Sequence, residues 1–318
     1  MGDVLFVIDP LPALVPGADS TYVMILEAQR RGLSVFASTL DDLLLAGPEA
    51  RAHATPIAIA EAGAPVLAAG EAKQRALAEF SVVLMRKDPP FDQGYLTATW
   101  ILDRAKARTL VLNDPAGLRH ANEKLSIFEF PDLIPQTRIL RREDDLRAAL
   151  ADFGGQMIVK PVFGFGGREV LRARTDDPNL GALFELATQE GTRWTVAQAF
   201  VPEAADGDKR ILLVDGEPIG AVLRVPAKGE GRNNFHAGGT AAKTELSDRD
   251  REICTAVGPY LRAHGQFFAG IDVIGGCLTE INVTSPTGMQ EINRLEGLEG
   301  DTTMEALFWS GIQRRLDS

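Results

Sequence analysis

Two short runs rich in valine and isoleucine surround a Gly-Gly pair in the stretch Gly270–Pro286, a pattern that predicts a β-hairpin. Residues two apart on a strand share a face, so Glu280 and Asn282 point the same way, and Asp272 joins them in one register only. Facing carboxylates destabilise a strand pair unless a cation lies between them. Carboxylate and amide oxygens are ligands that Mg²⁺ takes alongside phosphate oxygens. The hairpin therefore indicates either a divalent metal site or a solvated acidic surface.

The loop of this hairpin decides its register. With a three-residue loop, Gly275–Cys277, Asp272 lies opposite Glu280. With a two-residue Gly-Gly turn, Asp272 lies opposite Thr279, on the other face. We predict the three-residue loop, in which the two carboxylates and Asn282 come together.

Short apolar runs alternate with helical segments in the first 121 residues, which predicts a parallel α/β sheet. The stretch 47–75 is rich in Ala, Gly and Pro and has little periodicity, so we expect it to be irregular. The expected strands are 4–8, 34–38, 82–85 and 109–112, and the expected helices are 20–31 and 94–107.

From about residue 122 the pattern changes to an antiparallel-rich α+β region, with Asp215-Gly216 as a tight hairpin turn. Residues 226–243 form a long loop rich in Gly and Asn, which is typical of a functional or disordered segment. The expected strands are 137–140, 157–160, 169–172, 193–200, 209–215 and 218–225, and the expected helices are 142–152, 179–189, 248–264 and 302–316.

Charge argues against nucleic acid but for a local anion site. The 33 basic and 44 acidic residues give a net charge of −11, which disfavours wholesale binding of DNA or RNA. Lys160 ends an apolar strand, where a lysine is costly to bury without an anion. Arg210 and Arg224 likewise alternate into apolar strand faces. Positive charge is therefore expected to concentrate around one buried anion.

A glycine-rich turn, Gly164–Gly167, follows Lys160 closely. No Gly-Lys-Ser/Thr follows, so it is not a Walker A loop, and Glu169 stands where a dinucleotide fingerprint needs glycine. The free amides of such a turn can still approach a phosphate closely.

Cysteine, histidine and hydropathy patterns exclude several classes of protein. The two cysteines, Cys254 and Cys277, make no disulfide framework, and no Cys/His metal spacing is present. The N-terminal apolar run is too short for a signal peptide, and no run is long enough to span a bilayer. We expect a cytoplasmic protein with no membrane partner.

Several segments together resemble the bacterial-type glutathione synthetases, which are ATP-grasp ligases. The resemblance is carried, in order along almost the whole chain, by Met85–Asp92, Asn122–Leu125, Asp206–Arg210, Val214–Pro218 and Leu278–Pro286. It implies an N-terminal α/β substrate-side domain (1–121), an ATP-grasp small lobe with the Gly-rich loop (122–200) and a large lobe with the metal and acyl site (201–318). It also implies ligation of γ-glutamylcysteine to glycine with ATP and Mg²⁺, Mn²⁺ as a substitute metal, and a homo-oligomer, either a dimer or a tetramer.

The resemblance assigns expected roles to individual residues. Asp272, Glu280 and Asn282 match metal ligands, and Arg210 and Arg224 match arginines near the transferring phosphoryl and acyl groups. The nucleotide contacts are expected at Lys124, Lys160, Gly164, Gly166, Gly167, Gln198, Phe200, Val201 and Asp208, and the substrate contacts at Arg86, Arg232 and Ser285.

Chemically, the expected reaction activates a carboxylate as an acyl phosphate, which the amine then attacks. Phosphoryl transfer depends on positioning and charge neutralisation, so no Ser–His or Cys–His nucleophile is needed. The acyl phosphate must be kept from water, which suits the Gly-rich loop and residues 226–243 as lids.

Two departures from the family pattern leave other readings open. Thr240 follows Gly238-Gly239 where the family often has arginine, and Gly288-Met289 follows the Ser-Pro-Thr segment. Both lie where small substrates are expected. The alternatives are an ATP-grasp ligase for a different peptide or amino acid pair, and a nucleotide-binding regulatory protein without turnover.

Overall fold

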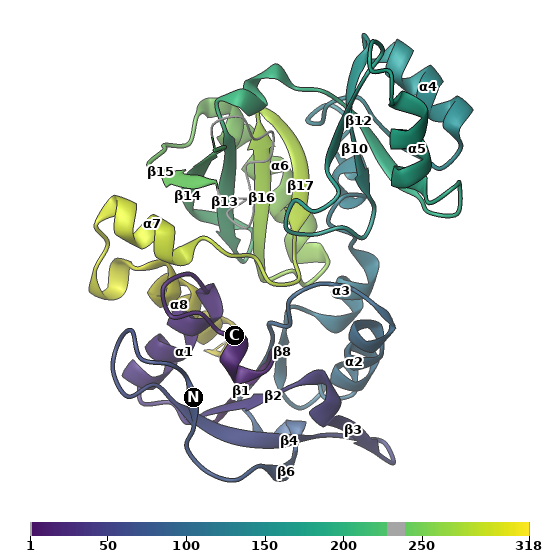
Figure 1. Ribbon diagram of the computed structural model, residues 1–318. Helices are drawn as coiled ribbons and strands as arrows, with labels where there is room; N and C mark the ends of the chain where they lie inside the picture. Colours follow the sequence, from purple (N-terminus) through teal and green to yellow (C-terminus); the bar gives the residue numbers. More distant parts are fainter. Residues whose placement is uncertain (1, 228–238, 318) are drawn as a thin grey trace.

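Three β-sheets organise the chain in the computed structural model, which describes residues 2–227 and 239–317 (Figure 1). The N-terminal sheet is mixed, with parallel pairing among β1, β2, β7 and β8 and antiparallel pairing around β4, and the other two sheets are antiparallel. The predicted combination of a parallel α/β part with an antiparallel α+β part is confirmed. Within the described residues, no helix is long and apolar enough to cross a membrane.

The N-terminal sheet has the strand order β3-β4-β2-β1-β7-β8, with β5 and β6 also paired to β4. Its parallel strands are β1 (Val4–Val7), β2 (Val35–Ser38), β7 (Val82–Met85) and β8 (Leu110–Leu112), and its helices are α1 (Ser20–Arg30), α2 (Gln93–Asp103) and α3 (Pro115–His120). Asp19 caps α1, because its Oδ1 accepts from the Thr21 amide at 2.7 Å.

The expectation of an irregular segment at 47–75 is wrong. The chain there forms antiparallel strands, β4 (Glu49–Ala58), β5 (Leu67–Ala68) and β6 (Lys73–Ala76), which follow β3 (Leu43–Ala46). Alternate residues of β4 are buried on one face, as in other strands, but the buried residues are alanines: Ala50, Ala52 and Ala54. Because alanine has low β-propensity, pairing with β2 and β3 decides the structure rather than local preference.

The small sheet has the order β11-β10-β12-β9 and stands apart with α4 and α5 (Figure 1). Its elements are β9 (Thr137–Leu140), α4 (Glu143–Asp152), β10 (Gln156–Pro161), β11 (Leu171–Arg174), α5 (Leu180–Thr188) and β12 (Thr195–Ala199). Met157, Val159 and Ala197 join the helices in a core of their own. Because side chains alternate along a strand, Lys160 and Gln198 lie on the opposite face, away from the helices.

The five-stranded sheet has the order β15-β14-β13-β16-β17. Its strands are β13 (Asp208–Val214), β14 (Glu217–Val225), β15 (Thr240–Ala242), β16 (Phe268–Ile274) and β17 (Cys277–Asn282), and the helices near it are α6 (Asp248–Ala263), α7 (Met289–Glu296) and α8 (Met304–Asp317). Short 3₁₀ helices lie at Leu11–Ala13, Leu40–Asp42, Leu77–Glu79, Ser126–Glu129, Pro202–Ala205 and Gly300–Thr302.

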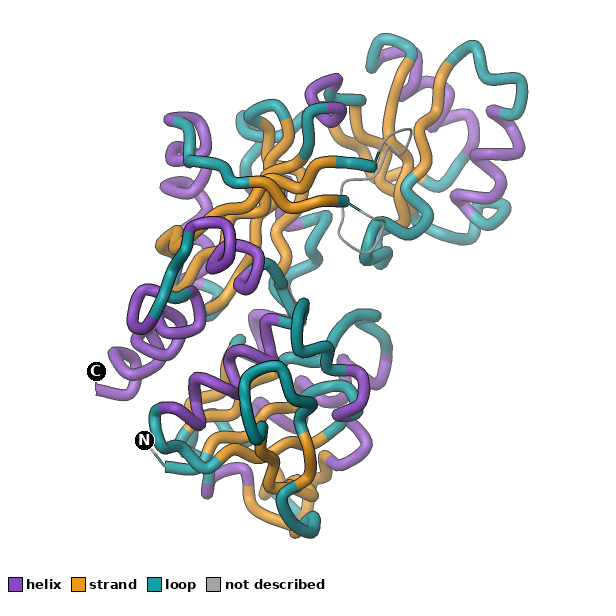
Figure 2. Tube along the Cα trace, turned by 60° about the vertical axis from the view of Figure 1, so that its left-hand side comes forward, coloured by secondary structure: helices purple, strands orange, loops and turns teal. Residues whose placement is uncertain are grey.

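Both faces of the five-stranded sheet are covered. Ile211 and Leu213 of β13 share a core cluster with α6, whereas Leu212 and Val214 share one with α8. Helix α8 also packs against α1, and the Trp309 indole donates to the Met24 carbonyl at 2.8 Å. The C-terminal helix thereby joins this sheet to the N-terminal part of the chain. The second view shows the two ends of the chain on the same side of the molecule (Figure 2).

The β16–β17 hairpin pairs Asp272 with Glu280, as predicted. The predicted three-residue loop is wrong, because Ile274 pairs with Cys277 and the turn is Gly275-Gly276 alone. Both glycines have positive φ (55° and 74°), which a two-residue hairpin turn of this kind requires. Thr279 is an extra residue in β17, and this bulge shifts the register so that the two carboxylates still face each other.

Candidate functional site

A cavity lies between the free face of the small sheet and the β16–β17 hairpin. Its polar lining includes most of the expected site residues from both sheets: Lys160, Gln198, Asp208, Asp272 and Glu280. Apolar side chains line the rest of it, among them Ile158, Val170, Phe200, Val201 and Ile274. A flat apolar group and a charged group can therefore occupy the same cavity.

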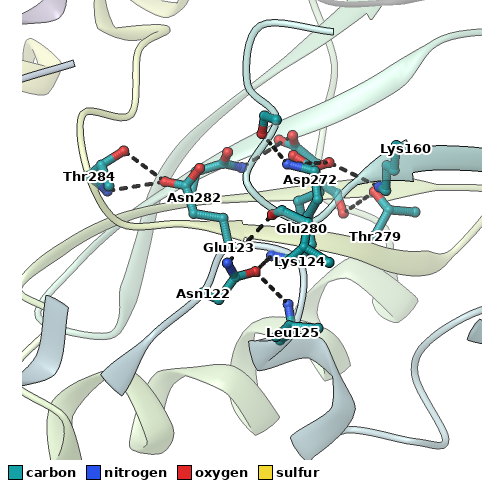
Figure 3. A network of polar contacts seen from close by, with 12 residues as sticks. Asn122, Glu123, Lys124, Leu125, Lys160, Asp272, Thr279, Glu280, Asn282 and Thr284 are labelled. Atoms are coloured by element: carbon teal, nitrogen blue, oxygen red, sulfur yellow. Dashed lines mark hydrogen bonds and ion pairs between the residues drawn. The ribbon is translucent and has the colours of Figure 1, made fainter. Parts of the chain in front are cut away.

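Glu280 forms an ion pair with lysines from two other segments (Figure 3). Its Oε1 lies 2.9 Å from Lys160 Nζ and 3.7 Å from Lys124 Nζ. Lys124 Nζ also donates to the Gly164 carbonyl. Burial alone would raise the pKa of Glu280, but the two lysines hold it below its ordinary value. Glu280 is therefore anionic and ties the large sheet to the small one.

Asp272 is paired with two arginines. Its Oδ1 accepts from Arg210 Nε at 2.5 Å, and its Oδ2 lies 2.9 Å from Arg224 Nη2. Arg224 also reaches Asp208, with Nε 2.5 Å from Asp208 Oδ1 and Nη2 2.8 Å from Oδ2. Burial opposes ionisation of Asp272, but Arg210 and Arg224 hold its pKa far below the ordinary value. Four basic and three acidic side chains thus converge at the hairpin.

The hairpin oxygens fit a hard divalent cation. Among the described residues, no donor contacts Glu280 Oε2 or Asn282 Oδ1, since Lys160 bonds Oε1 and the Asn282 amide nitrogen faces Gly270 and Asp272. Two oxygen donors two residues apart on β17 suit Mg²⁺. Within the same residues, no group of three or more His, Cys, Asp or Glu side chains forms a metal cluster. A metal here would therefore need oxygens from its ligand, such as phosphate.

The opposite end of the cavity has a fixed hydrogen-bonding direction. Thr137 Oγ1 donates to the Pro135 carbonyl at 2.7 Å and accepts from Gln198 Nε2 at 3.0 Å. Because the Gln198 amide nitrogen faces Thr137, the side-chain oxygen of Gln198 points away from Thr137 and can accept a hydrogen bond from a ligand. The Arg172 guanidinium lies 3.7 Å from the Phe200 ring centre, which orients the ring at the cavity wall.

The glycine-rich segment forms the turn between β10 and β11, as expected. Gly166 and Gly167 have φ of 62° and 73°, a conformation that other residues rarely adopt. A Cβ on Gly164 would lie 2.6 Å from the Pro161 ring, so this position also requires glycine. The turn places the Gly164 carbonyl against Lys124.

Glu123 is a residue at the site that sequence reasoning did not single out (Figure 3). Its Oε1 accepts from the Val283 amide (3.0 Å), the Thr284 amide (3.2 Å) and Thr284 Oγ1 (2.8 Å). Its carbonyl accepts from the Ile281 amide at 2.9 Å. Glu123 therefore fixes both Lys124 and the segment that leads to Ser285. A charged residue directly beside Lys124 was the available sequence signal.

Arg86 and Ser285 come from different parts of the chain and lie close together. Arg86 is buried, with Nε donating to Thr21 Oγ1 and Nη2 to the Pro286 carbonyl, both at 3.1 Å. Its Nη1 is buried and has no hydrogen-bond partner within the described part of the chain. Ser285 lies between Thr284, which Glu123 holds, and Pro286. Arg232, the third expected substrate contact, lies outside the described residues, as does Gly238.

Comparison with known proteins covers nearly the whole chain. Residues 3–119 match the family described as "Prokaryotic glutathione synthetase, N-terminal domain", and residues 123–297 match "Prokaryotic glutathione synthetase, ATP-grasp domain". The chain is 44% identical over 313 residues to the glutathione synthetase of Synechococcus elongatus (95% of this chain, 97% of that protein). It is 45% identical over 307 residues to that of Bradyrhizobium diazoefficiens (96% of each).

Solved structures are similar in fold at low sequence identity. The D-cycloserine synthetase DcsG has a TM-score of 0.69 and 13% identity, covering 98% of this chain and 99% of that one. The ATP-grasp ligase PsnB, complexed with a minimal precursor, Mg and ADP, has a TM-score of 0.63 and 14% identity, covering 99% of this chain and 98% of that one. At this identity the likeness shows the ATP-grasp fold alone.

Proposed function

Because the chain belongs to the prokaryotic glutathione synthetase family, we propose that it ligates γ-glutamylcysteine to glycine, with ATP converted to ADP and phosphate. One observation carries this proposal beyond family membership. Charged side chains from separate segments meet beside one cavity: Lys124, Lys160, Glu280 and the Asp272–Arg210 pair. Such a set suits a triphosphate, since it supplies fixed positive charge together with oxygen donors for a divalent ion.

Phosphoryl transfer to the γ-glutamylcysteine carboxylate requires positioning and neutralisation of charge. In our proposal Lys124 and Lys160 exchange part of their contact with Glu280 for phosphate oxygens. The amides of Gly164, Gly166 and Gly167 cover the phosphates, and Asp208 lies on the nucleotide side. At the base end, the Gln198 oxygen accepts from the exocyclic amine of adenine, with Phe200 and Val201 against the ring.

Glu280 and Asn282 would hold the divalent ion, with Asp272 as a third ligand that shares its oxygens with Arg210 and Arg224. When bound, the ion supplies Lewis-acid neutralisation of phosphate oxygens. We propose Mg²⁺, with Mn²⁺ as a substitute, because the donors are hard oxygens.

Acyl transfer would follow phosphoryl transfer and would take place beside Arg210. Arg210 and Arg224 lie beside the acyl phosphate and stabilise the oxyanion that forms when the glycine amine attacks. Arg86 binds a substrate carboxylate through its unpartnered Nη1, and Ser285 lies next to it. Arg232 is proposed as a further substrate contact.

Three further features belong to the same proposal. We divide the chain into a substrate-side domain (1–121), a small lobe (122–200) and a large lobe (201–318), because the small sheet has its own core. We also propose a homo-oligomer and a cytoplasmic location, the latter because the reaction consumes ATP.

A substrate panel tests the function. The protein is incubated with ATP, Mg²⁺, γ-glutamyl dipeptides and a set of amines, and phosphate release is measured together with the product mass. Release coupled to the mass of glutathione, only with γ-glutamylcysteine and glycine, is the expected outcome. Release with another pair would assign a different ATP-grasp ligase. No release with any pair would assign a binding protein without turnover.

A further inference from the structure

Glu291 is an acidic residue near the candidate site that the ion pairs described above do not use. It lies in the first turn of α7, six residues after Ser285 in the sequence. Its Oε2 is shielded from solvent and has no hydrogen-bond partner among residues 2–227 and 239–317. The other contact of its carboxylate is with its own backbone amide. A shielded carboxylate oxygen with no partner is costly, so it requires an explanation.

The start of α7 is fixed against Arg210. Arg210 Nη1 donates to the Thr287 carbonyl at 3.2 Å, and a methyl group on Gly288 would lie 3.6 Å from Arg210 Cγ. Ser20 Oγ accepts from the amides of Gly288 (3.2 Å) and Met289 (3.3 Å). The next residue, Gln290, donates to the Asp19 carbonyl at 2.6 Å. Glu291 therefore follows directly on a helix start that is fixed beside Arg210.

A purely structural role does not account for this carboxylate. An acid in the first turn of a helix is favoured by the helix dipole, but a solvated side chain provides that benefit equally well. Burial raises the pKa of Glu291 against the attraction of Arg294 and Arg210. Arg210 is not free to pair with it, since Asp272 and Thr287 occupy its nitrogens. The unpaired acid is therefore available to a cation that binds with the substrate.

The proposed substrates supply such a cation. γ-Glutamylcysteine carries an α-ammonium on its glutamyl end, and glycine enters as an ammonium. Arg86 contacts the Pro286 carbonyl, and its Nη1 is a positively charged donor with no partner among the described residues, whereas Glu291 offers a negatively charged acceptor. One short segment, 286–291, is thus associated with an unused donor and an unused acceptor, which suits an amino acid that bears both charges.

We infer that Glu291 is a specificity-determining residue that binds a primary ammonium group of the substrate. The inference rests on the proposed function. The two possible sources of the ammonium are the glutamyl end and glycine, and the experiment below distinguishes them.

The test compares Glu291→Gln with wild type in separate titrations of γ-glutamylcysteine, glutarylcysteine (which lacks the α-amino group) and glycine. Loss of a charge-assisted hydrogen bond should raise one KM roughly 10- to 100-fold. If the glutamyl end is bound, KM for γ-glutamylcysteine rises towards that of glutarylcysteine. If glycine is bound, KM for glycine rises instead. Either result supports the inference.

Glu296→Gln is the matched control, because Glu296 lies on the same helix but is already paired with Lys243 at 2.6 Å. If both KM values of Glu291→Gln equal those of this control, the inference is wrong, and a fall in kcat alone also overturns it. Thermal unfolding of both variants establishes that they fold, and Glu291→Asp replaces Glu291→Gln if the latter does not. Failure of wild type to make glutathione would instead overturn the proposed function.

Discussion

Replacing Glu280 by glutamine should destabilise the ligand-free protein as well as inactivate it. The change leaves Lys124 and Lys160, which are only 4% and 6% exposed, without their shared counter-charge. At an effective dielectric constant of about 20, a pair of charges 2.9 Å apart attracts by roughly 5 to 6 kcal/mol. Glu280 keeps 20% of its side chain exposed, and the new amide still accepts from Lys160, so we discount this to about 3 kcal/mol.

Urea unfolding of wild type and Glu280→Gln measures this loss, and the same experiment with saturating ATP adds a second expectation. Because phosphate oxygens would take the place of the lost carboxylate, the deficit should shrink when nucleotide is bound. Glutathione formation should fall by about 100-fold or more, since a proposed metal ligand is weakened. The control is Glu217→Gln, whose ion pair with Arg262 has a similar length, 3.0 Å, but is 75% exposed on the Glu217 side.

The reasoning about Glu280 is refuted if the unfolding free energies of Glu280→Gln and wild type agree to within about 0.5 kcal/mol, the range typical of surface changes. Full activity of the variant at ordinary Mg²⁺ would refute the metal assignment independently. A stability loss that nucleotide does not reduce would place the phosphates away from the two lysines.

Three other changes test separate parts of the structure. Burial raises the pKa of Cys254 from 9.0 to about 11, so the folded state holds this proton more tightly. Two pKa units correspond to a stabilisation of about 3 kcal/mol, which is present below pH 9 and is lost as the pH rises through 11. Over this range, wild type should lose that much more unfolding free energy than Cys254→Ala in urea titrations. Asn113→Ala removes three buried hydrogen bonds of 2.8 Å to Phe268 and Val283. The change should lower the unfolding free energy by about 3 kcal/mol in denaturant melts, and a loss under about 1 kcal/mol would contradict this reasoning. Thr137→Val frees the Gln198 amide and should raise KM for ATP several-fold with kcat little changed; unaltered ATP-over-GTP preference would count against an adenine-reading role.

Local patterns were sufficient for much of the fold and for the chemistry of the hairpin. The pairing of Asp272 with Glu280 follows from the side-chain chemistry, and the structure confirms it. The turn was mispredicted because a bulge at Thr279 places Asp272 opposite Glu280, as a three-residue loop would also do. A single sequence does not distinguish these two solutions, since both preserve the alternation on each side of the glycines.

Long-range contacts account for what the sequence did not reveal. The alanine-rich strand β4 depends on its partners rather than on its own propensity. Helix α7 was not predicted because its start is defined by a distant contact. Ser20 accepts a hydrogen bond from the amide of Gly288, which lies 268 positions away in the sequence. Glu123 was visible only as a neighbour of Lys124, and its three contacts with Val283 and Thr284 exist only in the folded chain.

The chain segment that positions Lys124 has a second consequence, for self-association. Strand β17 is the edge of its sheet, and an exposed edge can pair with the edge of another molecule. Here two of its outward amides are already used, with Ile281 donating to the Glu123 carbonyl (2.9 Å) and Leu278 to the Leu133 carbonyl (2.8 Å). The segment that brings a lysine to the site therefore also caps the sheet edge. Variants that loosen residues 123–133 should aggregate more readily as well as lose activity.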